Sequence, residues 1–172
     1  MGRKVLIFDL DKTITKDCLE GDKLNIVKNI VKQANKNKWP IYIVTSRPLI
    51  IHLNMYNILN DNVDKELASL IKNKRKYSDF LFYYNTHYAL KCSIYRGSMK
   101  MCQINDIIKK ENKKENPEDV FFFDNSKHNK DAFDKWCNYH GICKMNYIGP
   151  SVGCLFSDLN ELKTHYSNLF PL

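Results

Sequence analysis

Two carboxylates separated by one residue follow an apolar run near the start of the chain. Val5–Phe8 is a continuous apolar segment, typical of a parallel strand covered on both faces, and Asp9 and Asp11 come directly after it. Where the chain leaves the sheet, both carboxylates can turn toward one crevice, and they would repel each other unless a cation or a shared proton intervened. This favours a hard metal ion, and Mg²⁺ is the usual ion where phosphate is also a ligand. The alternative is a plain acidic turn, because Asp is common in turns.

Two later apolar segments also end in polar residues. Pro40–Val44 is followed by Thr45–Pro48, and Val120–Phe123 is followed by Asp124 and Asn125. Open α/β sheets bind ligands at the carboxyl ends of their parallel strands. The three segments together therefore predict one site at one edge of a sheet.

The order of these motifs resembles that of the haloacid dehalogenase-like (HAD) hydrolase superfamily. The first motif of that superfamily has the form Asp-x-Asp-x-Thr, and its second and fourth are apolar strands that end in Thr or Ser and in an acidic residue. Its third motif is a Lys on a later helix. The matching residues, in chain order, are Asp9, Asp11 and Thr13, then Thr45, then Lys100, and then Asp124. The four motifs cover the chain from Val5 to about Ala132.

The last motif departs from the common pattern. Many members carry a second acid directly after the first, and here that position is Asn125. Asn129 and Ala132 fall where a common variant of the motif has Asn and Ala. An Asn can hold a metal through its carbonyl oxygen but adds no negative charge, so weaker metal affinity than in two-acid relatives is expected.

The resemblance implies a phosphomonoester phosphatase that works through an aspartyl-phosphate. Asp9 would be the nucleophile, and Asp11 would protonate the leaving oxygen and then activate water. Mg²⁺ would be held by Asp9, the Asp11 carbonyl and Asp124. Thr45 and Lys100 would bind the phosphoryl oxygens. The acid at position 11 favours phosphate chemistry over dehalogenation, which has no alkoxide to protonate.

Further contacts to phosphate or substrate are assigned to Thr13, Ser46, Arg47, Asn125 and Asn129. Simpler interpretations exist for the weaker motif members. Thr45 can merely cap the next helix, Lys100 can be a surface lysine, and Arg47 can be a solvated turn residue.

The spacing of the motifs leaves little room for an inserted cap. Between Asp11 and Thr45 there are 33 residues, mostly one helix and one strand, and between Thr45 and Lys100 there are 54. A capless or minimally capped member is expected, with an open site that suits a phosphoprotein or a partly exposed small phosphate ester. Two alternatives stay open, a nucleic-acid 3′-phosphatase and a non-catalytic binding module on the same fold.

The elements that must position these residues alternate along the chain. We expect one domain over residues 1–172, with a three-layer, Rossmann-like α/β fold around a central parallel sheet, HAD-like in type. Further strands are predicted at Phe80–Tyr84 and Lys144–Ile148. Helices are predicted over Lys23–Lys38 with Asp22 as N-cap, over Leu49–Leu59, over Val63–Ile71, from Lys100 onward, after Asp124, and over Leu159–Tyr166.

The net charge of +8 allows a polyanionic partner without demanding one. Only four of the 27 basic residues are Arg, and the excess of Lys and Asn is typical of AT-rich coding. Nucleic acid therefore stays a possible substrate, and the densest run, Lys72–Lys76, is more typical of a solvated loop.

Cysteine usage and the first residues predict a cytoplasmic or nuclear protein. No apolar run reaches the about 18 residues of a membrane span, and the first strand begins too early for a signal peptide. The six cysteines form no Cys-x-x-Cys pair, so reduced thiols are expected. A zinc cluster of Cys137, His140 and Cys143 near His128 is the less favoured alternative, because Cys137 joins the apolar face of a helix.

Overall fold

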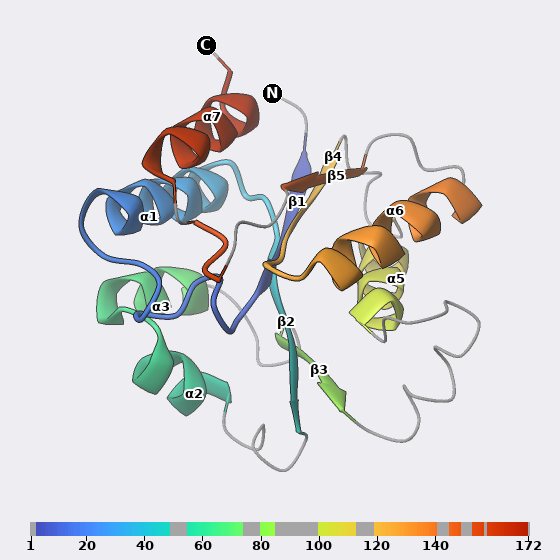
Figure 1. The fold of residues 1–172 in the computed structure, drawn as a ribbon, viewed down its shortest axis with the longest axis horizontal. Coiled ribbons are helices and arrows are strands. Elements are labelled where there is room, and N and C mark those ends of the chain that lie inside the picture. The colour runs from blue at the N-terminus through green and yellow to red at the C-terminus, as the bar shows by residue number, and fades with distance from the viewer. Residues whose placement is uncertain are drawn as a thin grey trace.

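The computed structural model describes residues 3–48, 55–73, 80–84, 100–112, 119–140, 145–148, 153–156 and 158–171. Strands and helices alternate along these ranges (Figure 1). The strands are β1 Lys4–Asp9, β2 Ile41–Pro48, β3 Phe80–Tyr84, β4 Asp119–Phe123 and β5 Met145–Ile148. The helices are α1 Gly21–Lys36, α2 Met55–Asn62, α3 Lys65–Lys72, α5 Lys100–Asn112, α6 Lys127–His140 and α7 Leu159–Leu169. The predicted α/β class is confirmed. Of the helices described, none has the length and apolar character needed to cross a membrane.

The described strands form one open sheet in which every neighbouring pair is parallel. Their order is β3-β2-β1-β4-β5, so the central parallel sheet predicted from the apolar runs is confirmed. From β1 the chain moves outward through β2 to β3, and it then returns to the other side of β1 to form β4. The strand order therefore reverses between β1 and β4. Doubly wound sheets bind ligands in the crevice at such a reversal, beyond the carboxyl ends of the strands.

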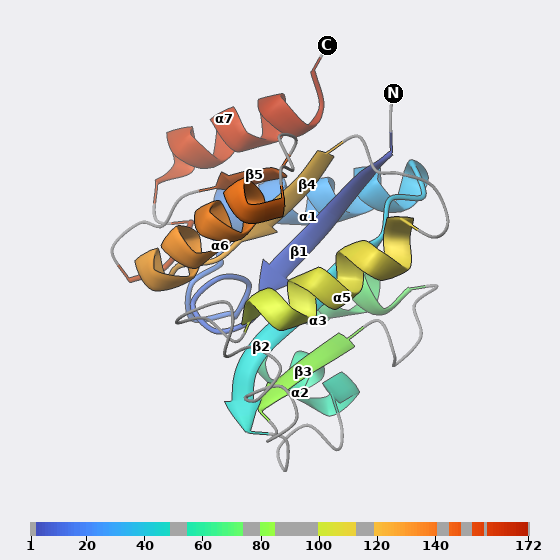
Figure 2. The same ribbon diagram turned by 90° about the vertical axis from the view of Figure 1, so that its right-hand side faces the viewer.

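Helices cover both faces of the sheet, because parallel strands need crossover connections (Figures 1 and 2). Side chains alternate along β1, so Leu6 and Phe8 pack on the side of α1, α3 and α7, while Val5 and Ile7 pack on the side of α5 and α6. All four side chains are fully buried. The continuous apolar run of β1 is thus explained by a strand with a core on each face.

The predicted start of the first helix is wrong. Helix α1 begins at Gly21, and its N-cap is Glu20, not Asp22, which lies in the first turn. Gly21 has a φ of +57°, a left-handed conformation that glycine adopts without steric cost, so the chain can enter the helix two residues earlier than predicted. Of the helix predicted over Leu49–Leu59, the structure describes the part from Met55 onward as α2, and residues 49–54 lie outside the described ranges.

Strand β2 is longer than its apolar run predicts. It continues through Thr45 to Pro48, so these polar residues belong to the strand itself. The pairing of β2 with β3 shifts register between Thr45 and Pro48. Such irregularities near the end of a strand change the direction of the side chains they carry.

One buried lysine shows that part of the positive charge is structural. Lys4 Nζ donates a hydrogen bond to the carbonyl oxygen of Leu169, at 3.1 Å. The same ammonium lies 5.4 Å from the ring centroid of Trp39 and 5.6 Å from that of Phe121, within cation–π range. Lys4 is 5% exposed, so it attaches the end of α7 to the sheet and is not available to an external polyanion.

Candidate functional site

Asp9 and Asp124 lie side by side at the reversal of strand order. Asp9 ends β1, Asp124 directly follows β4, and the preceding residues Phe8 and Phe123 are register partners. Neighbouring strands are about 4.8 Å apart, and residues at matching positions point to the same side of the sheet. Asp9 is 5% exposed and Asp124 is fully buried. Two buried carboxylates therefore follow neighbouring strands at matching positions.

Local hydrogen bonds orient each of these carboxylates. The Thr13 hydroxyl donates to Asp9 Oδ2 at 3.2 Å. Asp124 Oδ1 accepts from the backbone N–H of Ser126 at 2.8 Å, and Asp124 Oδ2 accepts from Asn129 Nδ2 at 2.9 Å. Thr13 and Asn129 were assigned to substrate, and in the structure each contacts a carboxylate. The motifs do not mark Ser126, although an Asp two residues before a backbone N–H is a familiar turn pattern.

The loop after β1 places Asp11 in a different environment from Asp9. The N–H groups of Thr13 and Ile14 both donate to the carbonyl oxygen of Leu10, at 3.3 and 3.2 Å, so the chain turns back at once. Lys12 has a φ of +57°, and its N–H donates to Thr15 Oγ1 at 3.1 Å. Asp11 is exposed where Asp9 is buried. One acid is thus held in place and the other is accessible for proton exchange.

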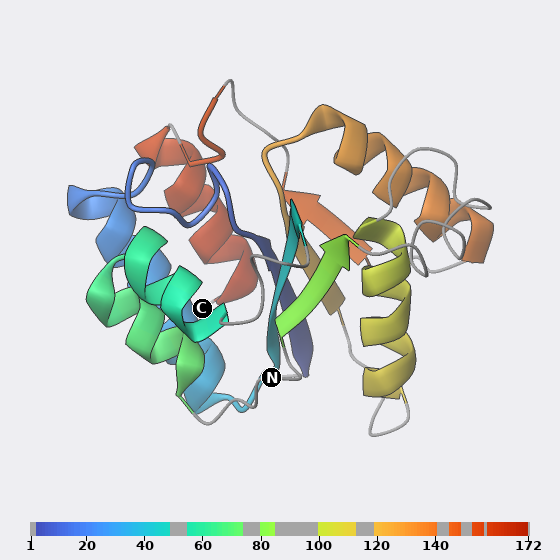
Figure 3. The same cartoon turned by 90° about the horizontal axis from the view of Figure 1, so that it is seen from below.

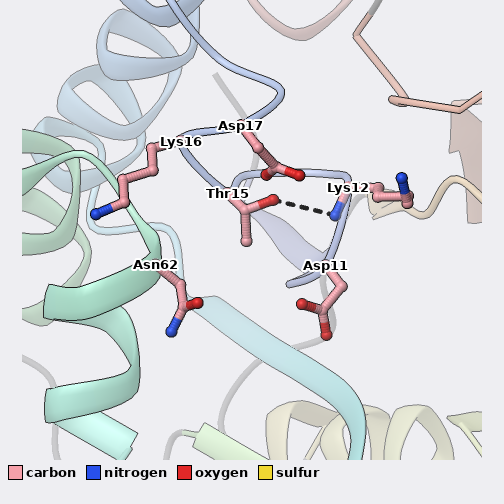
Figure 4. Close-up of a pocket in the computed structure, with 6 residues that line it drawn as sticks. All are labelled: Asp11, Lys12, Thr15, Lys16, Asp17 and Asn62. Carbon is pink, nitrogen blue, oxygen red and sulfur yellow. Dashed lines mark hydrogen bonds between the residues drawn. The ribbon is translucent and has the colours of Figure 1, made fainter.

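Asp11 also forms one wall of an open pocket of about 260 Å³ (Figure 4). The pocket lies between the loop after β1 and the end of α2. Its lining residues are Asp11, Lys12, Thr15, Lys16, Asp17 and Asn62. No sequence motif marks Asn62, because the residue comes from a helix whose position relative to β1 depends on the tertiary fold.

The remaining motif residues come from elements that reach the same edge of the sheet. Thr45 is fully buried on β2, one residue beyond Val44, the register partner of Asp9. Only the backbone of Ser46 and Arg47 is described, and both belong to β2. Lys100 is the first residue of α5, and its backbone alone is described. Figure 3 shows that α5 begins near the carboxyl ends of β2 and β3, so its positive dipole end lies on this side of the molecule.

The donor set fits Mg²⁺ better than a softer metal. No group of three or more His, Cys, Asp or Glu side chains converges within the described part of the chain, so the expected ligands Asp9, Asp11 and Asp124 do not form a three-carboxylate cluster. Mg²⁺ is commonly held by one or two carboxylates and keeps several waters. Asp9 and Asp124, buried at matching positions of neighbouring strands, are two carboxylates of the kind that such a site needs. Of the zinc alternative, the His140 side chain and Cys143 lie outside the described residues.

A short segment, residues 153–156, contacts both the loop after β1 and the loop after β4. Asn125 Nδ2 donates to the carbonyl oxygen of Gly153 at 3.1 Å, and the N–H of Leu155 donates to the carbonyl oxygen of Lys12 at 2.9 Å. A disulfide joins Cys18 to Cys154, with the Cα atoms 5.5 Å apart. The expectation of reduced thiols is therefore wrong for this pair, because the fold brings together two cysteines that are 136 residues apart.

This disulfide should contribute strongly to stability. Cross-links that close long loops restrict the unfolded chain, and losing a native disulfide typically costs about 2–5 kcal/mol. We expect dithiothreitol to lower the free energy of unfolding by about this amount, measured by urea denaturation. Cys18→Ser and Cys154→Ser should show the lower value with or without the reductant.

Cys137 provides the matched control for that experiment. It is half-buried on α6 against the apolar cluster under that helix, as the sequence predicts, and burial raises the pKa of its thiol to about 12. Cys137→Ser should keep the full response to dithiothreitol. A wild-type protein whose unfolding is indifferent to the reductant would contradict a stabilising role for the disulfide.

No protein-family model, curated protein or solved structure matches this chain. The function of the chain is therefore inferred from the four sequence motifs and from the geometry of the residues that carry them.

Proposed function

We propose that this chain is a HAD-like phosphatase that hydrolyses phosphate monoesters through an aspartyl-phosphate on Asp9. The observation that carries the proposal is the pair of buried carboxylates, Asp9 and Asp124, at adjacent positions where the strand order reverses. Burying two like charges side by side is unfavourable, and such pairs are retained where a cation or a reaction uses them.

In the first step, an Asp9 carboxylate oxygen attacks phosphorus, and the bond from phosphorus to the alcohol oxygen breaks. The alcohol leaves with a proton from Asp11, whose carboxyl is accessible at the wall of the pocket. The Thr13 hydroxyl, hydrogen-bonded to Asp9 Oδ2, holds the nucleophile in one orientation. Such positioning contributes because the reacting atoms then start close to the geometry of attack.

In the second step, Asp11 is a carboxylate and accepts a proton from water. The water oxygen attacks phosphorus, the bond to Asp9 breaks, and inorganic phosphate is released. Asp11 is protonated again and Asp9 is free, so the cycle closes. The exposure of Asp11 supports this role, because the group must exchange protons with the alcohol and with water in turn.

The charge of the transferred group would be balanced from three directions. When bound, Mg²⁺ would neutralise phosphate charge, with Asp9, the Asp11 carbonyl and Asp124 as its protein ligands. Asn129 and the Ser126 N–H keep the Asp124 carboxylate in position. Thr45 and Lys100 would contact the phosphoryl oxygens from β2 and from the start of α5.

Hydrolysis of p-nitrophenyl phosphate tests this assignment through its metal requirement. EDTA should stop the release of nitrophenolate, and added Mg²⁺ should restore it. Asp124→Asn keeps the size of the side chain and removes one negative charge. It should therefore raise the half-saturating Mg²⁺ concentration by at least about 10–100-fold, the range seen when a residue that supports a metal ligand is replaced.

A second measurement detects Mg²⁺ binding independently of turnover. Mg²⁺ should raise the Tm of the wild type, because a ligand that binds only the folded state stabilises it, and it should raise that of Asp124→Asn less. The matched control is Asp134→Asn, an exposed residue on α6 paired with Lys130. Full activity of the wild type in EDTA would refute the metal assignment.

A further inference from the structure

The chemistry of Asp11 locates the part of the substrate that departs. If Asp11 protonates the leaving oxygen, that oxygen must come within hydrogen-bond reach of the Asp11 carboxyl. The rest of the alcohol then continues into space adjoining this side chain. Asp11 is itself a lining residue of the pocket of about 260 Å³, so the pocket is where the alcohol is placed.

Every residue that lines this pocket carries a polar or charged group. In Figure 4 the Asp11 carboxylate and the Asn62 amide lie on opposite sides, with Thr15 between them. The side chains of Lys12 and Lys16 extend away on opposite sides of the view. A carboxylate and an amide facing the same space can accept and donate hydrogen bonds, as the hydroxyl groups of a ligand require.

The pocket is built on fixed backbone. The N–H of Lys16 donates to the carbonyl oxygen of Asn62 at 2.8 Å, which joins the loop after β1 to the end of α2. Asn62 Nδ2 donates to the carbonyl oxygen of Ile58 at 2.9 Å, so the amide is oriented. Preorganised walls of this kind lower the cost of ordering a site when a ligand binds.

From these observations, and resting on the proposed function, we propose that the pocket between the loop after β1 and α2 binds a compact, hydroxyl-bearing leaving group, and that Asn62 determines this specificity. The substrate class is a small polyol phosphate such as a sugar phosphate. The pocket volume is smaller than that of typical small-molecule sites, which is about 300–1,000 Å³, so it suits a compact polyol. A phosphoserine side chain would leave most of the pocket unfilled.

Three alkyl phosphates with similar leaving groups test the proposal: ribose 5-phosphate, ethyl phosphate and a phosphoserine peptide. We expect the wild type to have a kcat/KM for ribose 5-phosphate about 10–100-fold above that for the other two, as one or two added hydrogen bonds would give. Asn62→Ala should lower the ratio of ribose 5-phosphate to ethyl phosphate about tenfold, mainly through KM. Asn60→Ala, an exposed position on the same helix, is the matched control.

Because Asn62 also bonds to Ile58, Asn62→Ala can disturb the fold as well as the pocket. A second variant separates these two effects. Asn62→Gln keeps an amide but occupies part of the pocket, so it too should lower the ratio, while the Tm shows whether each variant is folded. Equal kcat/KM for the three esters, or an unchanged ratio in both folded variants, would overturn the specificity proposal.

A binding measurement distinguishes failure of this inference from failure of the proposed function. Calorimetric titration of the Asp9→Asn variant with ribose 5-phosphate in Mg²⁺ should show binding that Asn62→Ala weakens about tenfold. If the wild type hydrolyses none of the esters yet this binding is seen, the pocket stands and the phosphatase assignment is wrong. If turnover is seen but binding is indifferent to Asn62, the pocket assignment is wrong and the phosphatase stands.

Discussion

The Asp9→Asn variant should lose phosphatase activity by roughly 10⁴–10⁶-fold, the scale on which removal of a covalent nucleophile acts. The amide is a poor nucleophile, so no phosphoenzyme can form at this position. The amide oxygen can still accept the hydrogen bond from Thr13, and one of two adjacent buried charges is removed. The fold should therefore be kept, with a Tm no lower than that of the wild type. Release of inorganic phosphate and the Tm are the measurements.

The matched control is Asp22→Asn, an exposed carboxylate in the first turn of α1. It should hydrolyse substrate at the wild-type rate. Rapid acid quenching after addition of ³²P-labelled substrate should trap a phosphoprotein in the wild type and none in Asp9→Asn. A labelled Asp9→Asn protein, or one that turns over like the wild type, would show that the nucleophile is a different residue.

Replacing Asp11 with Asn should have an effect that depends on the leaving group. An alkoxide leaves poorly without a proton, so turnover of alkyl phosphates should fall by about 10²–10⁴-fold, the usual contribution of general acid catalysis. Nitrophenolate needs no proton to leave, so the first step with p-nitrophenyl phosphate should be much less affected. The measurement is the single-turnover rate for a series of phosphate esters, plotted against the pKa of the leaving alcohol.

The steepness of that plot is the decisive result. It should be shallow for the wild type, where Asp11 supplies the proton, and steep for Asp11→Asn, where the alcohol must leave as an anion. Parallel plots for the two proteins would contradict the acid role of Asp11, even if the variant were slower overall. Because Asp11 is exposed, its replacement should leave the Tm unchanged.

The parts of the site that the sequence predicts best are those attached to apolar strands. A run such as Val5–Phe8 can be buried on both faces only in the middle of a parallel sheet, so its end marks the carboxyl edge. The adjacency of Asp9 and Asp124 then follows once β1 and β4 are neighbours. That last step is not contained in the local pattern, because strand order depends on how the helices cross over the sheet.

Other features depend on contacts between segments far apart in the sequence. Six cysteines allow 15 complete pairings, so nothing in the spacing singles out Cys18 and Cys154. Asn129 resembles a substrate ligand in sequence, and only the start of α6 shows that its amide reaches Asp124. The wall formed by Asn62 depends on where α2 packs. The contacts that short polar side chains such as these form depend on the tertiary fold. Secondary-structure propensity does not determine these contacts.

The strand order also has a consequence for the synthesis of the chain. Asp9 is synthesised well before β4, the neighbour of β1 on one side, which begins at Asp119. At about 5–20 residues per second, roughly 6–24 s separate the synthesis of Asp9 from that of Asn129. During this interval one edge of β1 has no partner strand, which is the condition under which strands pair with other chains. A nascent chain stopped before Asp119 would thus carry the proposed nucleophile without the carboxylate that lies beside it, and it would be inactive and prone to aggregation.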